Sequence, residues 1–161
     1  MIVIFVEKKL ILNHEFKKVI FRTIDEDCPE NSALMCCIGN MRIYIASFNA
    51  FETLQRLFIR GRIIGSDFQA WEICRWRERH MAEDEYEQPL RDEDFPNIDS
   101  DDFLAWVDPF DFGAENHWNT YKEKDFKLIL EDAFTYWAKE SPKRRKEFSE
   151  ALAIYGMKLQ A

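Results

Sequence analysis

Apolar residues recur every three or four positions in the C-terminal third of the chain. This spacing places them on one face of a helix, where they can pack against a core. They are Phe126, Ile129, Leu130, Ala133, Phe134 and Trp137. Thr120 and Glu123 have the form of a capping box and predict where this helix begins.

The same spacing predicts a final helix near the C-terminus. Ser141-Pro142 favours its start, because proline suits the first helical turn, and Gly156 favours its end. The inward face of this helix is formed by Phe148, Ala151, Leu152 and Tyr155.

Two further helices are predicted in the middle of the chain. Asn49 and Glu52 resemble a capping box, and Gly61 is a suitable stop. The apolar stripe of this helix is Phe51, Leu54 and Phe58. Ser66 and Gln69 would open the next helix, with Phe68, Trp71 and Cys74 on one face.

The N-terminal part of the chain favours strands. Residues 1–6 form a short apolar run, and residues 34–38 and 41–46 flank Gly39-Asn40, a suitable two-residue hairpin turn. Residues 10–24 fit either a helix or a strand. We therefore predict an α+β fold, in which a small N-terminal antiparallel sheet or hairpin packs against four or five helices. Residues 1–161 would form a single domain.

Length and composition agree with one folded domain. A chain of 161 residues can bury roughly 70% of its unfolded surface, and 47% of its residues are apolar. The apolar start is interrupted at Glu7, too early for a signal peptide or a membrane span. The four cysteines, Cys28, Cys36, Cys37 and Cys74, contain no C-x-x-C pair. We therefore expect a cytoplasmic protein with reduced thiols.

The negative charge is concentrated in one segment. The chain has a formal charge of −8, yet residues 83–115 contain 13 acidic residues and one basic residue, Arg91. The segment therefore carries −12, and the remaining residues carry +4. Residues 82–119 also contain three prolines and many aromatic residues, which predicts a long excursion held to the body by its rings.

Two interpretations of this excursion stay open, with disorder as a third. In the first, the acids only solvate the surface or neutralise Arg75, Arg77 and Arg79. In the second, they form an anionic surface that steers a cationic partner to aromatic anchors. The predicted partner-binding residues are Asp92, Glu93, Asp94, Asp99, Asp101, Asp102, Phe103, Trp106, Asp108 and Asp111.

No catalytic or metal-binding motif is apparent. Asn97, Asp99 and Asp101 have calcium-loop spacing, but Asp102 replaces the glycine at position six and Asp108 the glutamate at position twelve. The three histidines lack zinc-site spacing, and no P-loop or G-x-S-x-G motif is present. We predict no catalytic residue, no metal and no cofactor.

Trp71 and Trp76 are interleaved with a cluster of arginines, a combination that can bind nucleic acid. The arginines are Arg56, Arg60, Arg62, Arg75, Arg77 and Arg79. The net charge of −8 disfavours this role. Residues 143–146, Lys-Arg-Arg-Lys, fall at a helix N-terminus, where cations are unfavourable, and receive no role.

The composition resembles that of bacterial immunity proteins and antitoxins that neutralise basic nuclease toxins. We predict a non-catalytic acidic protein that occludes a basic partner. A structural or adaptor protein with a solubilising loop, and a carboxylate-based enzyme, are the alternatives.

Overall fold

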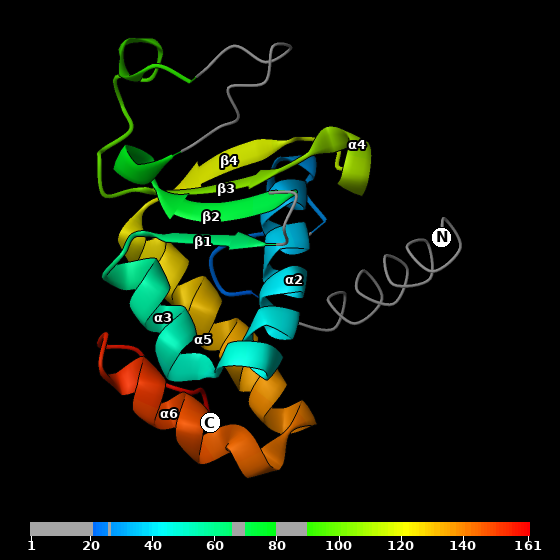
Figure 1. Ribbon diagram of the computed structural model, residues 1–161, viewed down its shortest axis with the longest axis vertical. Coiled ribbons are helices and arrows are strands. Elements are labelled where there is room, and N and C mark those ends of the chain that lie inside the picture. The colour runs from blue at the N-terminus through cyan, green and yellow to red at the C-terminus, as the bar shows by residue number, and fades with distance from the viewer. Residues whose placement is uncertain (1–20, 26, 66–69, 80–89) are drawn as a thin grey trace.

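The protein consists of a β-sheet with helices on one of its faces (Figure 1). The computed structural model describes residues 21–25, 27–65, 70–79 and 90–161. The four strands of the sheet are β1 (Arg62–Gly65), β2 (Trp71–Arg75), β3 (Phe103–Val107) and β4 (Trp118–Tyr121). They are antiparallel and lie side by side in sequence order. The predicted α+β class is confirmed.

Four longer helices occur among the described residues. They are α2 (Ser32–Phe48), α3 (Ala50–Phe58), α5 (Glu123–Glu140) and α6 (Arg145–Ala153). Helices α2 and α3 contact the sheet directly, whereas α6 packs against α3 and α5. A single turn, α4 (Pro109–Phe112), lies beyond the end of β3 (Figure 1).

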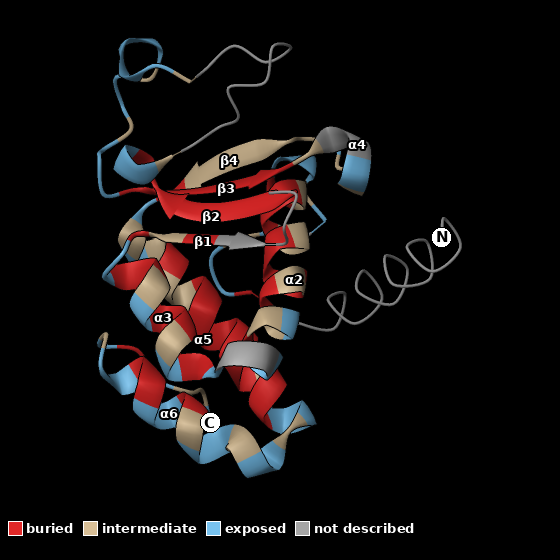
Figure 2. Cartoon of the chain, viewed as in Figure 1, coloured by how far each residue is buried: buried red, intermediate tan, exposed pale blue. Residues whose placement is uncertain are grey.

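The two central strands are buried on both faces (Figure 2). Towards the helices, Ile73 and Phe103 join the main core, and the Phe103 ring stacks on Phe126 with centroids 4.3 Å apart. A second cluster occupies the opposite face, which we call the outer face. Its buried members are Cys74, Trp76, Leu104 and Trp106.

Residues 34–46 belong to α2, so the predicted hairpin is wrong. The buried residues of this region repeat at helical spacing, and they are Leu34, Cys37, Ile38, Met41 and Ile45. The Asn40 side chain donates a hydrogen bond to the Cys36 carbonyl oxygen at 2.8 Å, one turn earlier in the same helix. Gly39-Asn40 favours a turn in isolation, but the burial of this helical face outweighs that local preference.

Residues 71–75 form β2, so the predicted helix is wrong here too. All five residues are buried, and a strand covered on both faces shows no alternation that would distinguish it from a helix. The sheet is built from residues 62–121 and is therefore not N-terminal. The predicted strand at 1–6, most of the ambiguous element at 10–24 and the Ser66–Gln69 signal lie outside the described residues.

Helix starts were predicted with mixed success. Asn49 caps α3 as expected, because its side chain accepts the Glu52 backbone N–H at 2.9 Å. Helix α5 covers the predicted apolar stripe, but its N-cap is Lys122, and Thr120 lies in β4. Helix α6 follows a 3-10 turn, Pro142–Arg144, and Gly156 has the positive φ expected beyond its end.

Glu147 of α6 connects this helix to the start of α3. Its Oε1 accepts the Ala50 backbone N–H at 2.9 Å, and both its oxygens accept hydrogen bonds from Arg144. The hydrogen bonds from Arg144 lower the pKa of Glu147 below its ordinary value of 4.5. A depressed folded-state pKa means that this contribution to stability is present above about pH 4.5 and is lost as the pH falls through the folded pKa.

We expect Glu147→Gln to lower the free energy of unfolding by roughly 1–2 kcal/mol at neutral pH, as for hydrogen bonds to a charged group. The loss should shrink towards zero in acid, below the lowered pKa of Glu147, where the wild-type carboxyl is also protonated. Urea denaturation at neutral and acidic pH measures this. Glu150→Gln, in the same helix and 3.8 Å from Lys146, is the control. An equal loss at both pH values would contradict the charge-based explanation.

Candidate protein-binding surface

Residues 90–102 lie against the outer face of the sheet and are fixed there by aromatic packing. The Phe95 ring meets Trp76 and Trp118 edge-on, with centroids 5.6 and 5.3 Å away. Leu90 and Ile98 pack against the same cluster. These contacts bury apolar area of the segment, whereas its acidic residues 92–94, 99 and 101 are exposed (Figure 2).

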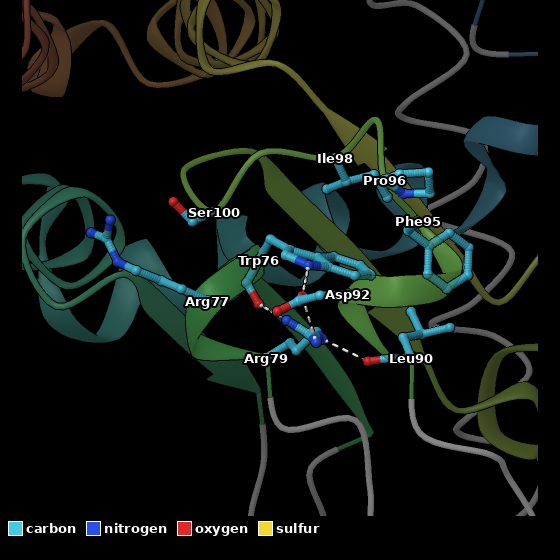
Figure 3. A pocket seen from close by; sticks show the side chains of 9 residues that line it. All are labelled: Trp76, Arg77, Arg79, Leu90, Asp92, Phe95, Pro96, Ile98 and Ser100. Carbon is cyan, nitrogen blue, oxygen red and sulfur yellow. Dashed lines mark hydrogen bonds and ion pairs between the residues drawn. The ribbon is translucent and has the colours of Figure 1, made fainter.

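Arg79 and Trp76 hold the beginning of this segment through polar contacts (Figure 3). The Trp76 indole N–H donates to Asp92 Oδ1 at 2.6 Å, and Arg79 Nη2 lies 3.0 Å from the same oxygen. Arg79 also donates to the Leu90 carbonyl oxygen at 2.9 Å, and its guanidinium lies 4.1 Å from the centre of the Trp76 ring. The beginning of the segment is therefore fixed by contacts within this chain.

The far end of the segment is held by Arg77 and Lys122. Arg77 pairs with Asp101, and Lys122 Nζ lies 2.8 Å from Asp99 and 2.7 Å from Asp102. Hydrogen bonds to the Asp102 and Asp99 carboxylates raise the pKa of Lys122. Two of the three arginines that we expected the acids to neutralise, Arg77 and Arg79, are thus paired with this segment. The third, Arg75, pairs with Glu123 of α5.

A pocket of about 780 Å³ opens where the segment meets the sheet (Figure 3). Leu90, Phe95 and Ile98 line it with apolar surface, and its charged lining residues are Asp92, Arg77 and Arg79. Within the described part of the chain, Asp92 Oδ2 makes no hydrogen bond, and the Asp92 side chain is 80% exposed. Arg79 pairs with Asp92 Oδ1 and Arg77 with Asp101, so the exposed Asp92 Oδ2 is the one described group of the pocket that attracts a cationic head, such as that of a lysine or arginine with its apolar stem.

The structure divides the predicted partner-binding residues into three groups. Five acids are exposed on the segment, and we call them the acidic surface: Asp92, Glu93, Asp94, Asp99 and Asp101. Asp108 and Asp111 follow β3, whereas the segment precedes it. A five-residue strand is roughly 17 Å long, so these two acids lie at the opposite end of β3 from the segment.

The third group is buried, which corrects our prediction for it. Asp102 is 6% exposed and Trp106 7%, and Phe103 is fully buried in the main core. Phe103 and Trp106 belong to the central strand β3, so they stabilise the sheet and cannot serve as exposed anchors. The residues that sequence reasoning missed are Trp76 and Lys122. No local sequence pattern links Lys122 to Asp102, because the two residues are 20 positions apart in the chain.

The two buried cysteines, Cys37 and Cys74, are not activated as nucleophiles. Burial raises the pKa of both the Cys37 and the Cys74 thiol, and for Cys74 the neighbouring Glu72 adds to the effect. Across the described ranges, no three or more histidine, cysteine, aspartate or glutamate side chains are grouped as a metal site would require. Asp99 and Asp101, which have calcium-loop spacing, are instead paired with Lys122 and Arg77.

Comparison with protein-family models, with curated proteins and with solved structures gives no match for this chain. In the part of the chain that the structure describes, no helix has the length and apolar character needed to cross a membrane.

Proposed function

We propose that this protein binds a basic partner protein through the acidic surface and occludes it without catalysing a reaction, as inhibitors and toxin-immunity proteins do. The observation that carries the proposal is the fixed position of the five exposed carboxylates. The rings of Phe95 and Trp76 hold the segment in place. A surface that is ordered before binding loses little conformational entropy on association, and its charge steers a cationic partner.

The pocket beside Asp92 supplies the second element of recognition. A charged rim alone mainly accelerates association, whereas a side chain buried in a pocket slows dissociation. Leu90, Phe95 and Ile98 offer this burial, and Asp92 Oδ2, the oxygen that Arg79 does not contact, offers the opposite charge. The partner would be a protein that presents lysine or arginine side chains, and a basic nuclease-type toxin is one such protein.

A second candidate function is that of a structural or adaptor protein in which the segment only covers the sheet. The ion pairs favour it, because Arg77, Arg79 and Lys122 engage four of the segment's acids. In that case residues 90–102 shield the apolar cluster on the outer face from solvent, and their acids increase the solubility of the protein.

The two functions are distinguished by neutralising acids that make no contact with the sheet's arginines. We expect Glu93→Gln with Asp94→Asn to slow association with the host partner by about five- to tenfold at low salt, and less at high salt. Asp111→Asn with Glu115→Gln removes the same charge beyond the other end of β3 and should change the rate less than about twofold.

The measurement starts with capture of the partner from the native host at low salt, using wild-type protein and both double variants. Association and dissociation rates of the purified partner are then measured at two salt concentrations. Asp92→Asn should mainly accelerate dissociation, because it removes the pocket's charge. A captured partner that is acidic, or one that binds all variants equally, would favour the structural function instead.

A further inference from the structure

Strand β1 forms one edge of the sheet (Figure 1). The Arg75 backbone N–H donates to the Gly61 carbonyl oxygen at 2.7 Å, and alternate residues of an antiparallel pair exchange such hydrogen bonds. Gly61 and every second residue after it therefore face β2, whereas the backbone N–H and C=O groups of Arg62 and Ile64 point away from it. Within the described part of the chain, these four outward groups make no hydrogen bond.

The composition of β1 does not protect this edge. Natural sheet edges are commonly blocked by proline or by lysine, and residues 62–65 contain neither. The charged side chain of β1, Arg62, is 22% exposed, and its Nε lies 2.7 Å from Glu72 Oε1 of the neighbouring strand. At the opposite edge, the Asn119 side chain accepts the outward N–H of Thr120 at 2.8 Å. The edge at β1 is therefore the one whose own residues leave it ready to pair.

An exposed stripe on α3 adjoins this edge. Phe51, Gln55 and Ile59 are four residues apart, so they lie on one face of the helix and its C-cap, and all three are exposed. Ile59 is 68% exposed, the highest value among the large apolar side chains that the structure describes, and β1 begins three residues later. Large exposed apolar side chains beside an unpaired strand are typical of a protein-binding surface.

The charged groups at the two ends of α3 are complementary. Arg56 makes both of its hydrogen bonds to Glu52 Oε1, and the second oxygen of Glu52 has no ion-pair partner among the described residues. Arg60 is exposed and likewise forms no ion pair in the described ranges. When two copies lie antiparallel, the start of one α3 is beside the end of the other. Glu52 of each copy can then pair with Arg60 of the other.

We propose that β1 pairs with β1 of a second copy of this chain, in an antiparallel dimer with two-fold symmetry. Arg62 of each copy exchanges hydrogen bonds with Ile64 of the other, which uses all four outward groups of each strand. The two sheets join into one, and the stripes of the two α3 helices meet beneath it. The acidic surface is anchored on Trp76 and Trp118 and not on β1, so this contact is separate from the proposed function.

Sedimentation velocity of the full-length protein detects the dimer, which should form with a dissociation constant of roughly 10–100 μM, as expected for a small interface. Backbone hydrogen exchange, measured by NMR in dilute and concentrated protein, then locates the contact. The Arg62 and Ile64 amides should be protected only where the dimer is populated. The Trp118 amide also points away from its neighbouring strand, but it lies on the other edge and should exchange freely at both concentrations.

Ile59→Lys should raise the dimer dissociation constant by at least about tenfold, because it places a charge in the apolar contact. Its exposure means that the fold should be unaffected. Glu140→Gln is the matched control, since it adds the same unit of positive charge at the exposed end of α5 and should change the constant less than about twofold. A chain that stays monomeric when concentrated, a dimer with unprotected Arg62 and Ile64 amides, or equal effects of the two variants would overturn the proposal.

Discussion

Phe103→Ala is expected to lower the free energy of unfolding by about 3–5 kcal/mol, the usual cost of removing a buried phenylalanine ring. Phe103 is fully buried in the central strand β3. It stacks on Phe126, and the Arg75 guanidinium lies 4.6 Å from the centre of its ring. The truncated side chain would leave a cavity between the sheet and α5, which the neighbouring elements cannot close without losing their own contacts.

Urea denaturation followed by circular dichroism measures this loss, and the slope of the unfolding free energy with urea should stay unchanged. Phe95→Ala is the contrasting variant, because Phe95 is only partly buried and lies in the segment over the outer face. It should cost roughly 1–2 kcal/mol and expose residues 90–102 to proteases. Equal losses for the two variants would mean that the segment is as central to the fold as β3.

Arg22→Met is expected to lower the free energy of unfolding by about 2–3 kcal/mol. Arg22 lies 2.7 Å from both Glu131 and Asp132, two adjacent and almost fully buried acids of α5. Removing one partner from a buried ion pair costs about 3–5 kcal/mol, because the other charge is left uncompensated. The Arg22 side chain is 38% exposed, so solvent screening reduces the expected value.

Thermal or urea unfolding at neutral pH measures the loss for Arg22→Met. Lys127→Met, which removes an ion pair with Glu123 on the surface of the same helix, should cost less than about 0.5 kcal/mol. Glu131 also accepts the backbone N–H of Lys158, so the C-terminal residues should become less protected from hydrogen exchange in Arg22→Met.

The arginine-rich region shows how charge is arranged within this fold. Five arginines between residues 56 and 79 each lie within 4 Å of an acid of the same chain. The pairs are Arg56–Glu52, Arg62–Glu72, Arg75–Glu123, Arg77–Asp101 and Arg79–Asp92. The net charge disfavoured nucleic-acid binding by this region and left internal pairing or a protein interface as the expectations, and the structure shows the internal pairing.

Elements that are covered on one side could be predicted from the sequence alone. Helices α3 and α6 each expose one face to solvent, so their apolar residues follow the helical repeat. The same repeat is visible in α5, although residues 129–135 are all buried, because the buried residues off its apolar stripe, Glu131, Asp132 and Thr135, are polar. The concentration of acids in residues 83–115 and the rings that accompany them were equally visible. So was the location of the acidic surface, to which Asp92, Asp99 and Asp101 belong.

Only the tertiary structure decided the elements that are buried on both sides and the contacts between distant residues. Strands β2 and β3 show no alternation because both of their faces are covered, and β3 therefore stayed hidden within the acidic segment. Lys122 meets Asp99, and Phe95 lies between Trp76 and Trp118, because strand pairing brings them together. A local pattern reports whether a residue is buried, but the partner that buries it depends on packing across the whole chain.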